Sequence, residues 1–350
     1  MKLQYIFGKA GSGKLESCIN DILIRQEEKY LPSVFIVPEQ FTLQAEKKVI
    51  EKSKTKVLFN TYVLNFKRLA YRVFSELGLS NKKPLEDIGK TMILRKILYN
   101  LNKEDLLKYF SEKSYSNIGL LEKIGDILKE FFEFGVEIDD LERVIKDENN
   151  KDKENLILKL SDLKEIYIKY KEFIKNDYIT DEGILDILAQ KIDQSSIITK
   201  DTEVFIYGFE AFNNQEINII YKLFEKCEKI NIYFTLNSNI TYFDKVNPFD
   251  HYFYVKNTIN KISDKIVNKV GVTVEKPIYL GQNKRHKNNE ELYFLEENFL
   301  IYNNKKYTKQ VENINIVCCQ NKYTEIENVS SIILDLVKNK GYNFKDIVII

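Results

Sequence analysis

Residues 1–30 constrain the fold of this chain more than any other stretch. An apolar segment at residues 3–7 and a later run with helical spacing flank the sequence Gly8-Lys9-Ala10-Gly11-Ser12-Gly13-Lys14. This is the G-x-x-x-x-G-K phosphate-binding pattern in its strand–loop–helix context. Glycines let successive backbone N–H groups turn toward one point, and the helix that follows adds the positive end of its dipole. We therefore predict a phosphate-binding loop, with ATP as candidate ligand, formed by Gly8, Lys9, Ala10, Gly11, Ser12, Gly13, Lys14 and Leu15.

Leu15 departs from the pattern of an active ATPase. In an active ATPase the residue after G-K is Ser or Thr, whose hydroxyl binds Mg²⁺. The end of a neighbouring strand supplies an Asp, usually followed by Glu. The candidate strand has Tyr207 and Gly208 at that point, and Glu210 lies beyond. Without the metal, the charge that develops on the reacting phosphate loses several kcal/mol of stabilisation. We predict a loop that binds nucleotide weakly or is vestigial and does not hydrolyse it, and we assign no catalytic or metal-binding residue. The alternative is a glycine-rich turn that binds nothing.

The next segments alternate between strand and helix patterns. Apolar runs predict strands at 33–38, 56–60, 203–209, 229–236, 272–274, 314–319 and 346–350. Helical spacing predicts helices from 41 to about 51 and at 62–78, 214–227, 252–270 and 325–338. Such alternation predicts an α/β fold with a parallel sheet and helices on its faces. Ligands of such sheets lie at the carboxyl ends of strands. We expect residues 8–14, Glu39-Gln40 and Asn60-Thr61 along that edge.

The strand signal fades between about residues 81 and 194. Helices are predicted at 88–97, 120–132 and 156–174, with Gly135 as a helix cap and a charged loop at 147–154. We predict an all-helical insertion at 81–194 within an α/β core formed by 1–80 and 195–310. The chain stops within an apolar segment, and an unpaired strand would expose a sheet edge. We therefore expect a fragment of a longer protein.

Composition excludes a strongly basic protein. Lys and Arg number 53 against 52 Asp and Glu, so nucleic-acid binding requires a local patch or a partner. The four cysteines, Cys18, Cys227, Cys318 and Cys319, form no C-x-x-C pair, and we expect reduced thiols in a cytoplasmic protein. No apolar run approaches the ~20 residues of a membrane span, so no membrane association is expected.

Five segments together point to a family. They are F-G-K-A-G-S-G-K at 7–14, V-P-E-Q-F-T-L-Q-A-E at 37–46, T-Y-V-L-N-F-K-R-L-A at 61–70, I-Y-G-F-E-A-F at 206–212 and G-Y-N-F-K-D-I at 341–347. In this order they resemble the N-terminal third of the B subunit of the bacterial AddAB (RexAB-related) helicase–nuclease. The resemblance covers essentially the whole chain.

The resemblance implies a degenerate UvrD-like helicase fold: a P-loop NTPase core of RecA-like type, a 1B-like helical insertion, and the start of a second RecA-like domain at 311–350. It implies a complex that processes double-strand DNA ends for recombinational repair. The partner would be an AddA-type, ATP-driven motor subunit in a heterodimer acting on single- and double-stranded DNA. The B subunit would handle the strand, recognise a recombination hotspot sequence and carry a C-terminal nuclease. Mg and an iron–sulfur cluster are implied only for the full-length family member. Some members carry Asp at the position of Tyr207.

DNA contact is predicted in outline around the third strand. The candidates, interleaved with aromatic residues, are Thr61, Asn65, Lys67, Arg68 and Arg72. The alternative is a solvated helix face over a core stripe. A second basic cluster, residues 284–287, is predicted to be a polar loop.

Three functional hypotheses remain open. The first is a non-hydrolysing, helicase-like subunit that handles DNA. The second is an active P-loop ATPase or kinase that recruits a carboxylate from elsewhere, such as Glu39 or Glu210. The third is a scaffold with a vestigial nucleotide site that binds only its partner subunit.

Overall fold

The computed structural model describes residues 1–79, 83–85, 87–110, 114–147, 153–180, 183–268, 271–299 and 305–350. The chain forms two compact units, residues 1–284 and residues 285–350. The division therefore falls before the boundary predicted at residue 311, and residues 285–310 belong to the second unit.

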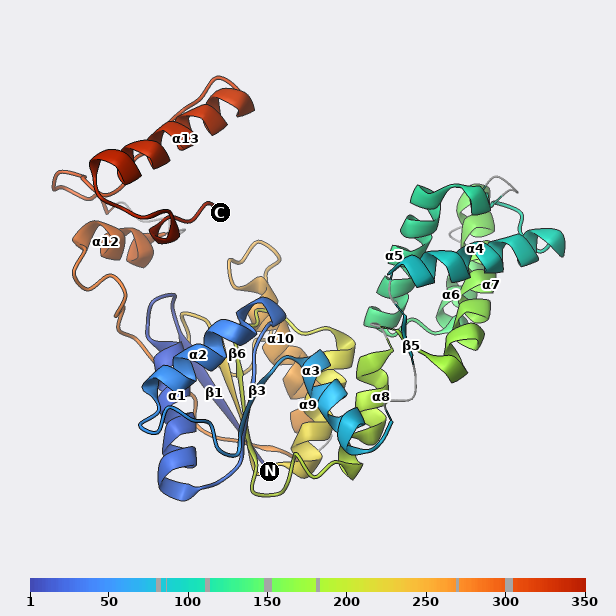
Figure 1. Ribbon diagram of the computed structural model, residues 1–350, viewed down its shortest axis with the longest axis horizontal. Coiled ribbons are helices and arrows are strands. Elements are labelled where there is room, and N and C mark those ends of the chain that lie inside the picture. Colours follow the sequence, from blue (N-terminus) through green and yellow to red (C-terminus); the bar gives the residue numbers. More distant parts are fainter. Residues whose placement is uncertain are drawn as a thin grey trace. The chain divides into compact units, whose positions relative to one another are not determined.

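A parallel β-sheet forms the centre of the first unit (Figure 1). In the described residues its strands are β1 (Lys2–Gly8), β2 (Ser33–Ile36), β3 (Thr61–Leu64), β6 (Glu203–Tyr207), β7 (Lys229–Thr235), β8 (Thr273–Val274) and β9 (Ile278–Tyr279). Their order is β3-β2-β6-β7-β1-β8, and β9 also pairs with β1. Every pair is parallel. The predicted α/β, RecA-like P-loop fold is confirmed.

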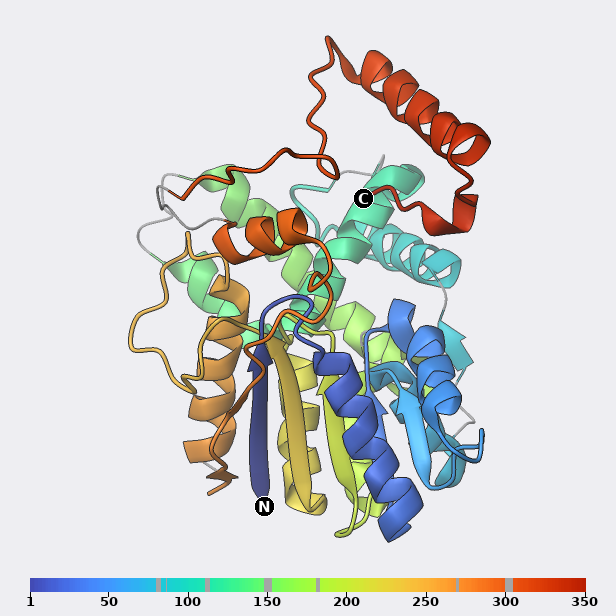
Figure 2. The same cartoon turned by 90° about the vertical axis from the view of Figure 1, so that its left-hand side faces the viewer.

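Helices cover both faces of the sheet (Figure 2). Strand side chains alternate between faces, so Leu3, Tyr5 and Phe7 of β1 enter one core while Ile6 enters the other. The Ile6 face is covered by α1 (Lys14–Ile24), which continues into a π-helical turn (Arg25–Lys29), and by α2 (Thr42–Lys52). The opposite face carries α3 (Phe66–Glu76), α8 (Ile184–Lys191), α9 (Asn214–Lys226) and α10 (Phe253–Ile262), the last followed by a π-helical turn (Ser263–Val267).

The third strand does not lie where the sequence predicted it. Residues 56–60 form turns, and the strand is Thr61–Leu64. Lys56 and Asn60 both have positive φ, 55° and 51°, which an extended strand does not accommodate. Thr61 pairs with Ser33 at the amino end of β2, so placing Asn60 and Thr61 at the carboxyl edge was wrong. The predicted helix at 62–78 accordingly begins only after Asn65.

The helical insertion has a hydrophobic core of its own. It consists of α4 (Asp87–Lys103), α5 (Ile118–Phe134), α6 (Ile138–Lys146) and α7 (Glu154–Asp177), with a 3₁₀ turn at Ser114–Ser116. Gly135 ends α5 with φ 66°, which confirms the predicted cap. Two short strands that were not predicted, β4 (Lys83–Leu85) and β5 (Tyr178–Thr180), pair where the chain enters and leaves the insertion. The predicted range 81–194 also contains α8, which packs in the core of the sheet instead. Part of the predicted loop at 147–154 lies outside the described residues.

The second unit contains α12 (Glu290–Asn298), α13 (Lys322–Asn339) and a 3₁₀ turn (Phe344–Asp346). The helix predicted at 325–338 is confirmed. The strands predicted at 314–319 and 346–350 were wrong, since neither segment is a strand in the described chain. A strand exists only where a neighbour completes its hydrogen-bond ladder, which an apolar sequence alone does not provide.

Two further observations concern the chain as a whole. All four cysteines are free thiols, with Cys18 and Cys227 buried. Among the described residues, we find no helix whose length and apolar character would suffice to cross a bilayer.

Candidate nucleotide-binding site

The loop between β1 and α1 is closely packed at two glycines. Gly11 and Gly13 have φ of 77° and 86°, a region that favours glycine. A Cβ on Gly8 would overlap the Ser12 hydroxyl and lie 2.9 Å from the carbonyl oxygen of Leu280. The loop therefore has the tight backbone path that the phosphate-binding pattern requires.

Lys14 points back into the loop. Its ammonium donates hydrogen bonds of 2.7 Å to the carbonyl oxygens of Gly8 and Lys9, and the residue is buried. Ser12 is also buried, and its hydroxyl has no hydrogen-bond partner among the described residues. The first N–H groups of α1 have no partner within the helix. The loop thus contains a buried cation, a buried hydroxyl and the N-terminus of a helix, which are groups that bind anions.

Lys284 completes this arrangement, and the sequence analysis missed it. Its backbone N–H donates to the carbonyl oxygen of Gly11 at 2.8 Å. A Cβ on Gly13 would lie 2.9 Å from Lys284 Cδ and 3.4 Å from Lys284 Nζ, so this side chain lies directly over the loop. Its position depends on β9, which pairs with β1 and brings a distant segment to the loop. The basic cluster at 284–287 contains no helix or strand, as predicted for a polar loop, but it includes this contact.

Apolar side chains occupy the positions of the two expected metal ligands. Leu15 and Tyr207 both pack against the buried cluster that contains Ile6, Cys18 and Phe205. The Tyr207 ring lies 5.9 Å from that of Phe41. The strand of Tyr207 was expected beside β1, but β7 lies between them. Neither a leucine side chain nor a tyrosine packed among aromatic rings is a ligand that Mg²⁺ prefers.

No described carboxylate compensates for these two residues. Among the described residues no group of three or more His, Cys, Asp and Glu is arranged to hold a metal ion. Glu39 follows β2, three strands from β1, which at ~4.8 Å per strand is about 14 Å away. Glu210 is exposed beyond the end of β6. The residues present therefore do not fit a divalent cation at this loop.

A second feature lies at the carboxyl edge of the sheet. Phe66, Phe209 and Phe212 form an aromatic cluster, with ring centroids 5.1–6.3 Å apart. Phe66 and Phe212 are buried, while Phe209 is only half-buried. These rings follow β3 and β6, and a cavity of about 590 Å³ opens beside Phe66 and Phe209. The edge thus offers one accessible aromatic face next to a hollow.

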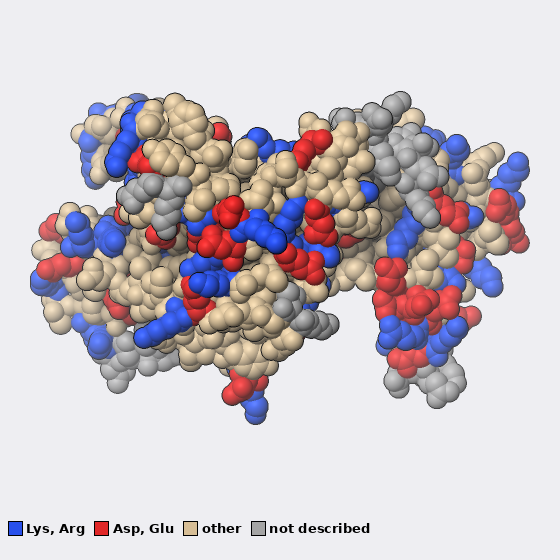
Figure 3. Space-filling view, turned by 90° about the horizontal axis from the view of Figure 1, so that it is seen from below, with Lys and Arg blue, Asp and Glu red and all other residues tan. Residues whose placement is uncertain are grey.

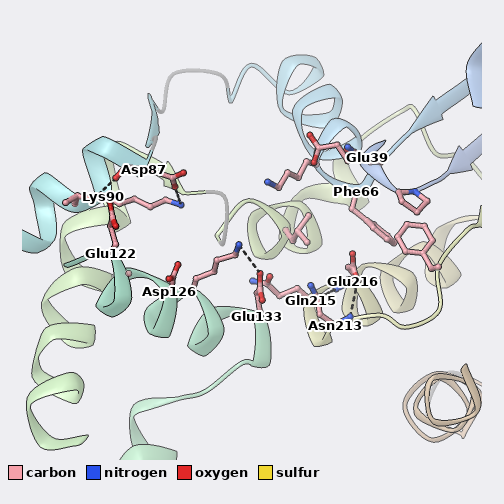
Figure 4. Close-up of a pocket in the computed structure, with 18 of the residues that line it drawn as sticks. Glu39, Phe66, Asp87, Lys90, Glu122, Asp126, Glu133, Asn213, Gln215 and Glu216 are labelled. Carbon is pink, nitrogen blue, oxygen red and sulfur yellow. Dashed lines mark hydrogen bonds and ion pairs between the residues drawn. The ribbon is translucent and has the colours of Figure 1, made fainter. Parts of the chain in front are cut away.

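Acidic residues dominate the cavity (Figure 4). Its charged lining comprises Glu39, Asp87, Glu122, Asp126, Glu133 and Glu216, against Lys67, Lys90 and Lys129. Glu216 caps α9 by accepting a hydrogen bond of 2.9 Å from the backbone N–H of Asn213. Burial, with Glu133 nearby, raises the pKa of Glu216 to about 7. The interior of the cavity therefore disfavours phosphate groups, so a nucleic-acid backbone would lie outside it.

The five predicted DNA-contact residues have different surroundings. Asn65 and Lys67 line the cavity, and the Asn65 side chain caps α3 by accepting from the Arg68 N–H at 2.7 Å. Arg68 is exposed in the first turn of α3, and the Arg72 guanidinium lies 4.0 Å from the centre of the Tyr62 ring. Thr61 is buried at the opposite edge of the sheet. Asn65 and Lys67 thus share the cavity, Arg68 and Arg72 lie on α3 outside its lining, and Thr61 lies at the opposite edge of the sheet.

The surface carries charges of both signs. On the face seen in Figure 3, basic and acidic side chains are interspersed rather than gathered into one field. This agrees with the net charge of +1. An anionic ligand must therefore be bound by local groups, such as those of the loop, and not by the field of the whole molecule.

Similarity to known proteins extends over the whole chain. The chain matches the family model described as ADDB, N-terminal, over residues 5–296. It is similar to proteins named as the B subunit of an ATP-dependent helicase/deoxyribonuclease, with 36% identity in Clostridium botulinum (strain Loch Maree / Type A3), 35% in Clostridium novyi (strain NT) and 33% in Caldanaerobacter subterraneus subsp. tengcongensis. Each alignment covers 100% of this chain, which spans about 30% of the length of these relatives. The match confirms the resemblance seen in the sequence motifs, and the chain belongs to the AddB N-terminal family.

Proposed function

We propose that this chain is the helicase-like, non-hydrolysing N-terminal part of a subunit that processes DNA ends in double-strand break repair by recombination. The relatives are named as one subunit of an ATP-dependent helicase/deoxyribonuclease, which supports a DNA substrate and a partner subunit. In this proposal an AddA-type subunit is the motor, and the present chain handles the single strand and recognises a hotspot sequence. Nuclease chemistry belongs to the part of the relatives that this chain does not match.

The proposal that this chain does not hydrolyse nucleotide rests on one observation. Leu15 and Tyr207 replace the hydroxyl and the carboxylate that would hold Mg²⁺, and both pack against one apolar cluster. Hydrolysis needs the charge that develops on the outer phosphate to be neutralised, and the metal contributes several kcal/mol to this. The loop keeps the groups that bind phosphate: Lys14, the Ser12 hydroxyl and the N-terminus of α1. Binding without turnover follows from this combination.

ATP turnover by the purified 350-residue chain tests this part of the proposal. We expect release of phosphate to be the same with Mg²⁺, with EDTA and in the Lys14→Ala variant. Metal-dependent turnover that Lys14→Ala abolishes would refute it and would favour the active-ATPase hypothesis. As a positive control, Leu15→Thr with Tyr207→Asp restores both ligand types, and we expect Mg²⁺ to tighten ATP binding only in that variant. A thermal melt checks that the double variant is folded.

Single-strand binding is proposed at the carboxyl edge, on the side of α3. Phe209 offers a half-buried ring on which a base can stack, and stacking contributes about 1–3 kcal/mol per base. Lys67 lines the acidic cavity, and Arg68, the next residue of α3, is exposed. The two cations are placed to contact phosphates while the backbone avoids the cavity carboxylates.

Salt titration of single-strand DNA binding by the complex with the partner subunit tests this surface. Removing two phosphate contacts with Lys67→Ala and Arg68→Ala should lower the slope of log K against log salt by about 1.4, since each contact on a single strand contributes about 0.7. Lys47→Ala with Lys48→Ala is the matched control, because these two lysines lie on α2 at the opposite face of the sheet. An unchanged slope in the variant with Lys67→Ala and Arg68→Ala would contradict the proposed DNA-binding surface. Absence of both DNA and nucleotide binding in the wild-type protein would favour the scaffold hypothesis.

A further inference from the structure

Lys284 is placed at the loop by two separate contacts. Its backbone N–H donates to the carbonyl oxygen of Gly11 at 2.8 Å, and its stem and ammonium lie over Gly13. Just before it, the N–H of Leu280 donates to the carbonyl oxygen of Phe7 at 2.8 Å, which holds the segment along the end of β1. The position of this lysine is therefore fixed by the backbone and does not depend on a flexible loop reaching inward.

The side chain has the chemistry of a phosphate ligand. Lys284 is exposed, whereas Lys14 is buried, so one ammonium lies above the loop and the other within it. Between them are the left-handed Gly13 and the start of α1. The buried Ser12 hydroxyl lies against Gly8 in the same loop and lacks a hydrogen-bond partner among the described residues, so it is available to a ligand. An anion bound to this loop would therefore have the ammonium of Lys14 on one side and that of Lys284 on the other.

Charge balance explains why a second lysine matters here. A nucleoside triphosphate brings several negative charges, and in metal-dependent loops Mg²⁺ neutralises part of them. Leu15 and Tyr207 pack against one apolar cluster and carry neither the hydroxyl of Ser or Thr nor the carboxylate that would hold that ion. A fixed ammonium close to the loop can provide the missing positive charge without any metal ligand.

We propose that Lys284 is a second phosphate-binding lysine of this loop, and that Lys14 and Lys284 together hold a nucleoside triphosphate without a divalent cation. This inference rests on the proposed nucleotide binding and adds to it the residue and the metal independence. Lys284 acts on the phosphates furthest from the nucleoside, so triphosphate binding depends on it more than diphosphate binding.

Nucleotide binding to the full 350-residue chain tests the inference, with a fluorescent ATP analogue and the matching ADP analogue as probes. Affinities are measured in EDTA and in Mg²⁺ for wild type, Lys284→Met, Lys284→Arg and Lys14→Ala. Lys284→Met keeps an unbranched apolar stem over Gly13 and removes only the charge. Lys287→Ala, three residues further along the same basic cluster, is the matched control.

We expect wild-type affinity for the ATP analogue to be the same in EDTA and in Mg²⁺. Lys284→Met should weaken it roughly 10- to 100-fold, as expected for one charge-assisted hydrogen bond, with a smaller effect on the ADP analogue. Lys284→Arg should restore most of the affinity, and Lys287→Ala should leave it unchanged.

The outcomes separate this inference from the function on which it rests. If the wild-type chain binds both analogues and Lys284→Met binds them equally well, the role of Lys284 is overturned while nucleotide binding stands. If wild-type binding requires Mg²⁺, the metal independence is overturned. If the wild type binds neither analogue in either buffer, both the inference and the proposed nucleotide site fail.

Discussion

The carboxyl group of Glu216 makes the stability of the first unit depend on pH. Its pKa is raised from the ordinary 4.5 to about 7 because it is largely removed from water, with Glu133 nearby. Between these values the folded chain keeps a proton that the unfolded chain has released, so stability falls as pH rises from 4.5 to 7 and is lowest above 7. At about 1.4 kcal/mol per tenfold change in proton affinity, the loss reaches about 3 kcal/mol. Partial solvent exposure of the side chain reduces it, so we expect roughly 1–3 kcal/mol.

Glu216→Gln removes this penalty and keeps the cap. The amide oxygen can still accept from the Asn213 N–H but stays neutral at every pH. We expect the variant to match wild type at pH 4.5 and to have a free energy of unfolding roughly 1–3 kcal/mol higher at pH 8.5. Urea unfolding followed by far-UV circular dichroism measures both values. Glu210→Gln, which changes an exposed carboxylate shortly before α9, is the control. An equal difference between variant and wild type at the two pH values would refute the reasoning.

Two further substitutions test a helix cap beside the cavity and a buried carboxylate in the helical insertion. Asn65→Ala removes the acceptor for the Arg68 N–H and should lower the free energy of unfolding by about 1 kcal/mol. Asn65→Asp keeps an acceptor at the cap and should cause no such loss. Equal losses of stability for the two variants in thermal melts would contradict this expectation. Asp162 is buried in the insertion, and its carboxylate accepts from the backbone N–H groups of residues 108–110 at 2.8–3.0 Å. Asp162→Ala leaves these buried donors without an acceptor and should destabilise the insertion by roughly 3 kcal/mol or more. Hydrogen exchange should then show a loss of protection in α4 and α7, and unchanged protection would contradict this role of Asp162.

Corrections to the sequence-based expectations have a common physical origin. Residues 56–60 are apolar enough for a strand, yet Lys56 and Asn60 adopt positive φ and the strand begins at Thr61. Residues 314–319 and 346–350 are as apolar as true strands but have no ladder partner in the described chain. Helix α8 follows the helical insertion in sequence but packs on the sheet. In each case apolar character was read correctly, but local backbone conformation, the presence of a ladder partner or long-range packing decided the structure.

Residue patterns alone predict the loop, the alternation of strands and helices, and a leucine and a tyrosine at the two positions where an active ATPase has metal ligands. These depend on glycine geometry, on side-chain periodicity and on the residue types at Leu15 and Tyr207, all of which are local. The strand order, which places β7 between β1 and β6, and the position of Lys284 over Gly13 become visible only in the three-dimensional arrangement. This arrangement also gathers Glu133 and Glu216 into one cavity. Strand pairing joins residues separated by hundreds of positions, and no local pattern carries that information, because the free energy that selects a pairing comes from burying whole faces of the sheet.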